Sequence, residues 1–357
     1  MGRRGGRTGR EMEKDRELDG PMIKTIALMI ISLSFTAVAA GQWIKYPVDT
    51  TASFRGLAVV DSRVIWASGT GGTVIRTTDG GDSWQVITVP GAENLDFRDI
   101  EAFDSKTAYI LSIGNGDASR IYKTIDGGKT WSLQFTNRED AAFYDALACW
   151  DRKNCIAMSD PVDGFYRLLE TRNGVDWTII DTEKMDKAMQ GEAAFAASGT
   201  CLIAVGRNTV FLVTGGSDAR VFRSDDRGWS WTVADTPLPS GTPGSGIFSI
   251  AMLDFRRGVI VGGNYELPDE ASGNLAFTSD GGKTWTSGTG LSGYRSAVVH
   301  IDRRTLIAVG TNGSDISSDG GTTWTRLGKQ NLNAVAVRGH GSVWAVGPAG
   351  AVYKLAP

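Results

Sequence analysis

Thr77-Thr78-Asp79-Gly80-Gly81-Asp82-Ser83-Trp84 is the first of six related segments in this chain of 357 residues. The other five cover residues 124–131, 170–177, 224–231, 278–285 and 317–324. The tryptophans that end the six segments are 47, 46, 54, 54 and 39 residues apart. A repeat of roughly 40–50 residues is typical of the blades of a β-propeller.

Each segment has the chemistry of a tight turn between two strands. The Ser or Thr begins the turn, the Asp carboxylate can accept backbone N–H groups across it, and the glycines adopt positive φ without steric cost. The Trp then begins the outermost strand, where its ring can fill the gap to the neighbouring blade. We therefore expect a structural and not a catalytic role for these aspartates. In the third segment, Arg172 stands at the expected Asp position.

The strand count predicts how the ring closes. Alternation and β-branched residues predict four strands in the first repeat, at residues 56–60, 64–68, 73–77 and 83–89. The last repeat contains only three, at residues 333–337, 342–346 and 351–355, while an unassigned strand, Gln42–Tyr46, precedes the first repeat. Pairing these ends removes exposed sheet edges. The sequence thus predicts an all-β, seven-bladed propeller closed by its N-terminal strand, with one helix at residues 181–190.

The N-terminal region has the pattern of an export signal. Lys24 precedes an apolar run, Ile26–Phe35, and small residues follow to Ala40. This stretch is shorter than the roughly 20 residues of a membrane span. We expect a signal peptide at residues 22–40 and a single propeller domain at 41–357. Residues 1–21 form either a disordered extension or a segment upstream of a true start at Met22. An uncleaved signal that anchors the chain stays open as an alternative.

Composition excludes several classes of function. The net charge of −3 is unlike that of a protein that coats nucleic acid, so no nucleic-acid partner is expected. Two histidines and three cysteines fit no metal site, no phosphate loop is present, and neither metal nor cofactor is predicted. Cys149 and Cys155 bracket a turn and are predicted to form a disulfide in an exported chain.

Candidate binding residues emerge when the starts of the innermost strands are aligned blade by blade. The residues predicted to surround the central channel are Arg55, Arg98, Tyr144, Glu192, Phe248, Arg295 and Asn333. Three arginines fall within four consecutive blades, and guanidinium groups suit carboxylates or phosphates. This clustering predicts an anion site. The alternative is that the arginines form structural ion pairs with Asp99, Asp145 or Glu192.

The six segments look like Asp-box, or bacterial neuraminidase, repeats. With the closing strand and the phrases at residues 53–57 and 294–296, residues 42–357 resemble the photosystem II stability/assembly factor family. The resemblance implies a non-enzymatic lumenal propeller that binds a protein segment during assembly of a membrane complex. The family's arginine patch would match Arg55, Arg98 and Arg295. An insertion at residues 265–273 and the third segment depart from the family pattern.

Two functions follow. The first is an exported, monomeric assembly propeller, in the periplasm, outside the cell or in a thylakoid lumen, with no catalytic residue. It would bind a client's acidic or carboxylate group, and would meet a membrane only through that client or an uncleaved signal. Its candidate site comprises Arg55, Arg98, Arg295, Asn333, Tyr144 and Glu192. The second is a sialidase-type hydrolase for an anionic sugar, with Tyr144 and Glu192 as candidate groups. The absence of an Arg-Ile-Pro phrase near the first blade argues against it.

Overall fold

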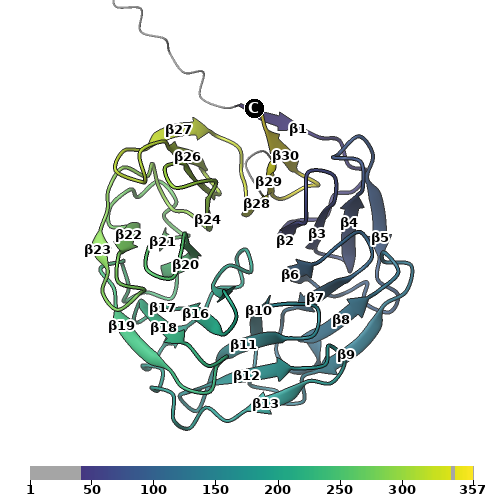
Figure 1. Ribbon diagram of the computed structural model, residues 1–357, viewed down its shortest axis with the longest axis horizontal. Helices are drawn as coiled ribbons and strands as arrows, with labels where there is room; N and C mark the ends of the chain where they lie inside the picture. Colours follow the sequence, from purple (N-terminus) through teal and green to yellow (C-terminus); the bar gives the residue numbers. More distant parts are fainter. Residues whose placement is uncertain (1–41, 339–341, 357) are drawn as a thin grey trace, which may run out of the picture. The chain divides into compact units, whose positions relative to one another are not determined.

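The computed structural model describes residues 42–338 and 342–356. In this part of the chain, seven antiparallel sheets surround a central channel (Figure 1), which confirms the predicted seven-bladed β-propeller. The expectations for residues 1–40 lie outside the described residues. Within the described ranges, no helix has the length and apolar character needed to cross a membrane.

The strands follow the repeat. Blade one contains β2 (Phe54–Val59), β3 (Ile65–Gly69), β4 (Thr73–Thr77) and β5 (Gln85–Thr88), and blade two contains β6 (Phe97–Ala102), β7 (Ala108–Ser112), β8 (Arg120–Thr124) and β9 (Ser132–Thr136). Blade three contains β10 (Tyr144–Cys149), β11 (Cys155–Val162), β12 (Phe165–Thr171) and β13 (Thr178–Ile180), and blade four contains β15 (Leu202–Val205), β16 (Thr209–Val213), β18 (Arg220–Ser224) and β19 (Thr232–Asp235).

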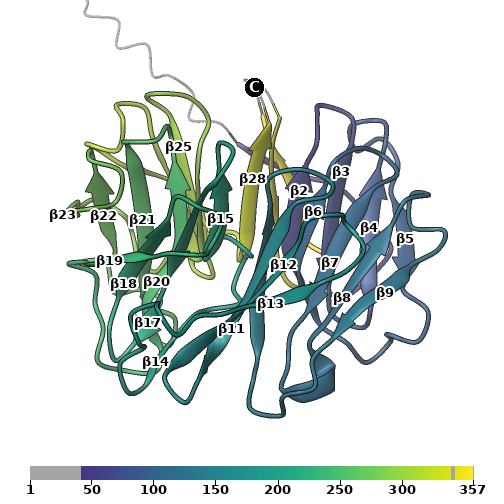
Figure 2. The same cartoon turned by 60° about the horizontal axis from the view of Figure 1, so that its bottom comes forward.

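The remaining blades complete the ring. Blade five contains β20 (Ser245–Met252), β21 (Gly258–Asn264), β22 (Leu275–Thr278) and β23 (Thr286–Ser287), and blade six contains β24 (Ala297–His300), β25 (Leu306–Gly310), β26 (Gly313–Ser317) and β27 (Thr325–Gly328). Blade seven contains β28 (Ala334–Arg338), β29 (Ser342–Val346), β30 (Val352–Leu355) and β1 (Trp43–Lys45). Two short strands, β14 (Glu192–Ala193) and β17 (Gly215–Gly216), extend the sheet of blade five on its inner side. Figure 2 shows β28, β2 and β6 beside one another near the axis.

The N-terminal strand closes the ring as predicted. β1 pairs antiparallel with β30, placing Trp43 opposite Leu355. The Trp43 ring is 5% exposed, and its Nε1 donates to Ser314 Oγ on blade six at 2.9 Å. The first strand therefore supplies the fourth strand of the last blade and also bonds to the blade before it.

The turns of the six repeated segments (the boxes) are held by their own side chains. In the first box, the Thr77 hydroxyl donates to Asp79 at 2.6 Å and accepts the Gly81 N–H at 3.0 Å. Asp79 also accepts the Ser83 N–H at 3.0 Å. Gly81 has φ +100°, a backbone conformation that glycine adopts readily. The same hydrogen bonds recur around Asp126, which supports a structural role for the box aspartates.

The third box corrects the sequence alignment. Asn173, and not Arg172, occupies the Asp position, since its Oδ1 accepts the N–H groups of Val175 and Asp176, both at 2.9 Å. The Thr171 hydroxyl accepts the Gly174 N–H three residues later, where the other boxes use a spacing of four. The third box is thus one residue shorter, and it keeps the turn with an amide in place of a carboxylate.

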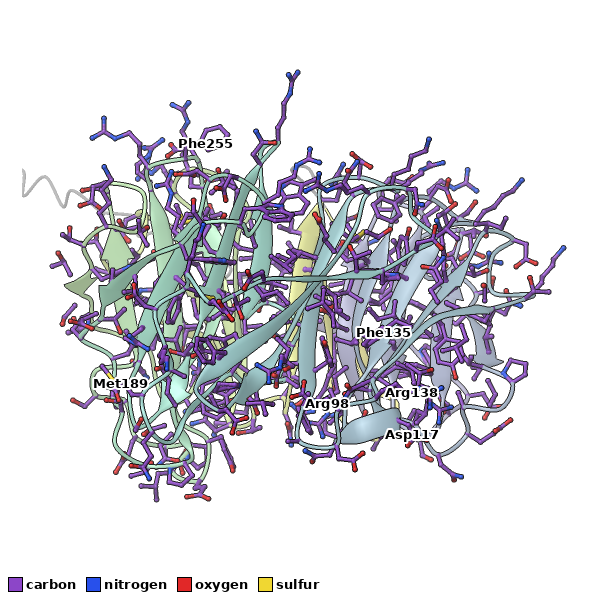
Figure 3. All side chains as sticks on the ribbon, turned by 90° about the horizontal axis from the view of Figure 1, so that it is seen from below. Arg98, Asp117, Phe135, Arg138, Met189 and Phe255 are labelled. Atoms are coloured by element: carbon purple, nitrogen blue, oxygen red, sulfur yellow. A yellow bond between two sulfur atoms is a disulfide. The ribbon has the colours of Figure 1, made fainter. Side chains whose placement is uncertain are left out.

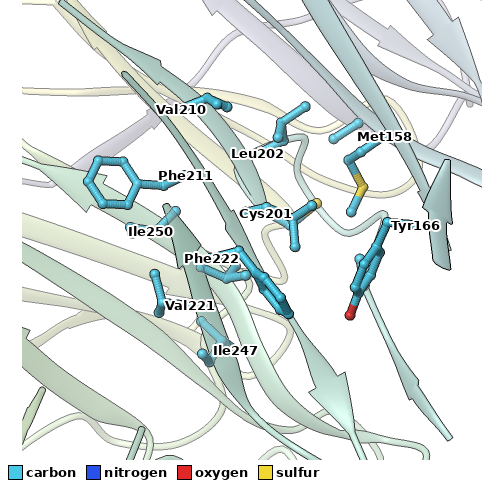
Figure 4. Close-up of a cluster of buried hydrophobic side chains, with 14 of the residues drawn as sticks. Met158, Tyr166, Cys201, Leu202, Val210, Phe211, Val221, Phe222, Ile247 and Ile250 are labelled. Atoms are coloured by element: carbon cyan, nitrogen blue, oxygen red, sulfur yellow. The ribbon is translucent and has the colours of Figure 1, made fainter. Parts of the chain in front are cut away.

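Aromatic rings from the boxes pack between blades. Trp84 meets Trp344 of blade seven edge-on with centroids 5.6 Å apart, and Trp177 meets Tyr109 of blade two at 6.2 Å. A larger apolar cluster joins blades three, four and five (Figure 4), where Tyr166 lies edge-on to Phe222 at 5.4 Å. Burial between neighbouring sheets therefore accounts for the apolar periodicity of the repeats.

The helix predicted at residues 181–190 is not formed. The segment bonds to neighbouring parts of the chain instead: the backbone N–H of Ala188, which a helix would pair internally, donates to Gly164 O at 3.0 Å, and the Thr182 hydroxyl donates to Tyr166 O at 2.9 Å. A segment this short has little intrinsic helical stability. Cys149 and Cys155 lie opposite each other on β10 and β11 and are joined by a disulfide.

Candidate functional site

A pocket of about 430 Å³ lies at one mouth of the channel. Its lining comes from several blades and comprises Arg55, Arg98, Phe143, Asp145, Asp160, residues 194–197, Phe248, Tyr265, Tyr294, Ser296, Thr311 and Asn333. The box turns lie at the other end of the blades, where the Gly281 N–H bonds to Arg256 O in the β20–β21 turn. Figure 3 shows the two ends, with Arg98 toward the lower side and Phe255 toward the upper side.

Backbone bulges aim side chains into this pocket. The pairing of β2 with β3 skips Arg55, and the pairing of β6 with β7 skips Arg98. The same irregularity falls at Asp145 on β10 and at Phe248 on β20. A bulge leaves one residue unpaired and redirects its side chain. The predicted positions of Arg55, Arg98 and Phe248 at the mouth agree with these bulges.

Arg55 and Arg98 form a cationic pair beside the pocket. Arg55 Nη1 donates to Ala197 O at 3.1 Å, and Arg98 Nη1 donates to Ala196 O at 3.3 Å. Arg98 Nε also bonds to Asp96 at 2.7 Å, whereas Arg55 has no ion pair with any described residue. Burial, followed by repulsion from Arg98, lowers the pKa of Arg55. An anion in the pocket would relieve this repulsion.

Arg295 does not reach the mouth, contrary to the alignment. It is fully buried, and its Nε donates to Asp315 at 2.8 Å while Nη1 donates to Asn312 Oδ1 at 2.7 Å. Its predicted place is taken by Tyr294, which lines the pocket. Arg295 thus forms a structural ion pair, the alternative considered for the arginines, although with Asp315 and not with the acids expected.

Tyr144 is displaced from the mouth by one residue. The bulge of blade three falls at Asp145, so Tyr144 takes the buried position that Phe54 and Phe97 hold in blades one and two. Its ring packs against Phe135 at 5.3 Å. Asp145 lines the pocket instead, because side chains on a strand alternate between faces and a one-residue shift exchanges them.

Glu192 lies on a strand added to blade five and not on the innermost strand of blade four. That innermost strand is β15, which begins at Leu202. The Glu192 carboxylate forms a buried ion pair with Arg220 and accepts the Thr214 hydroxyl at 2.6 Å. Asn333 does line the pocket, and its Nδ2 donates to Phe54 O at 2.9 Å, which links blade seven to blade one.

An aromatic cluster forms one wall of the pocket. Phe195 stacks on Phe248 with centroids 3.9 Å apart, and Tyr294 meets Phe248 edge-on at 4.7 Å. Tyr265 packs edge-on against both phenyl rings and is 46% exposed. Of these residues, sequence alignment had placed only Phe248 at the channel. The wall offers apolar contact to a ligand side chain beside the arginines.

An acidic pair, Asp145 and Asp160, lies in the same pocket. Asp160 Oδ1 accepts the Ala194 N–H at 2.7 Å, while Asp145 Oδ2 receives no hydrogen bond from a described donor. Burial raises the pKa of both carboxyls, Asp160 to about 6, and the charge of Asp160 raises that of Asp145 further. Two buried carboxyls at close range do not ionise together readily.

Asp99 is a further buried acid, with a structural role. Its carboxylate accepts the N–H groups of Ile100 at 2.8 Å and of Leu147 in blade three at 2.7 Å, and burial raises its pKa to about 7. Within the described residues, no cluster of three or more His, Cys, Asp or Glu side chains could hold a metal ion.

Comparison with known proteins supports the fold. No family model matches the chain. YCF48 from Cyanidioschyzon merolae superimposes with a TM-score of 0.65 at 18% identity, covering 88% of this chain and 99% of that chain. YCF48 bound to D1 peptide gives a TM-score of 0.64 at 15% identity, covering 94% and 100%.

One protein related in sequence is described as an enzyme and not as a YCF48 protein. A xyloglucanase from Paenibacillus sp is 25% identical over an alignment of 317 residues, and the match covers 80% of this chain. The match covers 27% of the xyloglucanase, so the chain spans about a quarter of that protein's length.

Proposed function

We propose that this chain is an exported, non-enzymatic propeller that binds a protein or peptide segment and assists the assembly or stability of a membrane or envelope complex. The observation that carries the proposal is the pair Arg55 and Arg98, held side by side at the channel mouth against an aromatic wall. The likeness to YCF48 structures, one of them bound to D1 peptide, supports a peptide client. The sequence resemblance to the photosystem II stability/assembly factor family points to the same function.

The geometry suits the C-terminus of a client. A terminal carboxylate would bond to Arg55, whose remaining guanidinium donors have no partner among the described residues. Charge-assisted bonds of this kind are stronger than neutral ones. An apolar side chain of the client would pack on Phe248 and Tyr294, since such a pocket needs few polar groups to orient its ligand. A single copy of the chain supplies every residue of this site, in line with a monomer.

The proposal is tested with C-terminal peptides selected from a displayed random library, each made as the free acid and as the amide. We expect amidation, and separately Arg55→Ala, to weaken binding at least tenfold, because each removes one partner of the carboxylate bond. Arg256→Ala, in the turn at the other end of blade five, is the matched control. Equal affinity for acid and amide, or unchanged binding by Arg55→Ala, would refute a carboxylate site.

A glycoside hydrolase remains the second candidate, because the xyloglucanase match gives it weak support. The pocket offers Asp145 and Asp160 as a carboxyl pair, whereas the Tyr144 of the sialidase hypothesis is buried against Phe135. Incubation with xyloglucan and with a fluorogenic sialoside tests both forms. Turnover that is lost in Asp160→Asn would favour the hydrolase, and absence of turnover on both substrates would leave the binding function.

A further inference from the structure

We propose that Asp145 and Asp160 form a subsite for a cationic side chain, lysine or arginine, of the bound peptide. This inference rests on the proposed function and adds a specificity to it. The carboxylate of the client would meet Arg55 and Arg98, and the cation would meet the acidic pair across the same pocket.

No salt bridge joins either acid of the pair to a described cation, although the charge of Arg98 opposes the rise in the pKa of Asp145. Asp145 is 1% exposed, and its Oδ2 receives no hydrogen bond from a described donor. Arg98, which lines the same pocket, already bonds to Asp96 and to Ala196 O. The two carboxyls can share one proton between them, and a buried carboxylate oxygen that lacks a donor, such as Asp145 Oδ2, is still costly to a fold. A ligand ammonium or guanidinium would supply the missing donors.

The Asp160 carboxyl is held in place before any ligand binds. Asp160 accepts the Ala194 N–H through Oδ1, and its own N–H donates to Phe143 O at 2.9 Å. Asp145 is directed inward by the bulge in β10. Acceptors fixed by neighbouring contacts lose little freedom on binding, which favours recognition over a purely structural pairing.

The surroundings fit a long cationic side chain better than a bare ion. Phe195 follows Ala194 and stacks on Phe248, so the apolar stem of a lysine can lie along the aromatic wall. A metal ion is disfavoured, because the described residues hold no cluster of three or more candidate ligands.

The rest of the client has a route out of the pocket. A second pocket, of about 640 Å³, shares Phe143 and Asp160 with the first and continues past Gly164 and Met189. Asp160 therefore lies between the arginine pair and this exit. The cationic side chain that binds Asp160 is expected within the last few residues of the client, upstream of its terminal carboxylate.

Matched peptides test the subsite. In the best C-terminal binder, each of the last four residues is replaced in turn by lysine and by norleucine, which has a similar length and no charge. We expect one position at which wild-type protein prefers lysine at least tenfold, and we expect that preference to fall below twofold in Asp160→Asn. The Asn side chain can still accept the Ala194 N–H, so the fold is retained; Asp145→Asn is the second variant. Arg55→Ala should weaken the binding of the lysine peptide and of the norleucine peptide by a similar factor.

The outcomes separate the two proposals. If peptides bind through their carboxylates but lysine is preferred nowhere, or is still preferred in both Asn variants, the cation subsite is wrong and the peptide site stands. If no peptide binds, n-butylammonium with n-butanol as control is added during thermal unfolding. If n-butylammonium raises the melting temperature of wild type but not that of Asp160→Asn, the result supports the subsite with another client. If wild type melts at the same temperature in n-butylammonium and in n-butanol, the subsite is wrong.

Discussion

Replacing Trp43 by alanine should weaken the pairing of β1 with β30 that closes the ring (the latch). The ring of Trp43 is 5% exposed and donates to Ser314 on blade six, so truncation leaves a cavity and removes a buried hydrogen bond. Burial of about 200 Å² of aromatic surface at about 25 cal/mol/Å² corresponds to about 5 kcal/mol. Measured Trp or Phe to Ala replacements in cores cost about 3–5 kcal/mol. We therefore expect a loss of about 4 kcal/mol.

Thermal unfolding converts this loss into a measurable shift. An unfolding entropy of about 2.1 cal/mol/K per residue, over about 315 residues, gives about 0.7 kcal/mol/K. A loss of about 4 kcal/mol then lowers the melting temperature by about 6 °C. The shift is followed by calorimetry, and protease resistance of the N-terminal strand is measured in parallel.

Trp229 provides the matched control. Its ring is 48% exposed and stacks with Arg172, whose Cζ is 5.5 Å from the ring centroid. An exposed cation–π contact contributes about 0.5–1 kcal/mol, so Trp229→Ala should lower the melting temperature by no more than about 2 °C. Equal shifts for the two variants, or an N-terminal strand that stays protease-resistant in Trp43→Ala, would refute the latch.

Three further predictions concern pH and the disulfide. The pKa of Asp160 is about 6 in the folded state against an ordinary 3.8, so the folded state holds an extra proton between these values and its stability falls as pH rises through them. The Asp160→Asn variant should therefore melt at a higher temperature than wild type at pH 7.5 but not at pH 4. An equal difference in melting temperature at both pH values would contradict this. Hydrogen bonds from the Thr284 hydroxyl and the Thr284 N–H lower the pKa of Asp280 to about 2. The stabilisation of the fold by the ionised Asp280 carboxylate is therefore complete above about pH 4 and disappears toward pH 2. The Asp280→Ala variant should melt at a lower temperature than wild type at pH 7 and at a similar temperature at pH 2. The Cys149–Cys155 disulfide closes a loop with a sequence separation of 6, and breaking it should lower the free energy of unfolding by about 2 kcal/mol. Reductant should therefore lower the melting temperature of wild type by about 3 °C. The melting temperature of a Cys149→Ser/Cys155→Ser variant should not change with reductant.

The part of the fold readable from sequence is the part made by local contacts. In the first box, Thr77, Asp79, Gly81 and Ser83 bond to one another within seven residues, so the pattern and its turn appear together in one stretch of chain. The closing strand was also predictable, since one strand precedes the first repeat and the last repeat lacks its fourth strand, so pairing the two satisfies both exposed edges.

The site was only partly predictable, because it depends on register and on distant partners. A bulge at Asp145 in place of Tyr144 exchanges which side chain faces the channel, and no local signal in the sequence marks that shift. The alignment also could not show that Glu192 belongs to a strand added to blade five.

The amino-acid sequence by itself determined seven blades, the turns of the six repeated segments and the closing strand, because these follow from alternation and contacts a few residues long. Tertiary structure alone decided which arginines remain available: Asp315, brought against Arg295 by the pairing of blade six, neutralises one of the three. It also brought the carboxyl of Asp160, on β11, beside that of Asp145 on β10, and placed residues 194–197 against Arg55 and Arg98. The first two contacts depend on strand register within one blade, and the third arises when separate blades pack around a common axis; a linear pattern encodes neither.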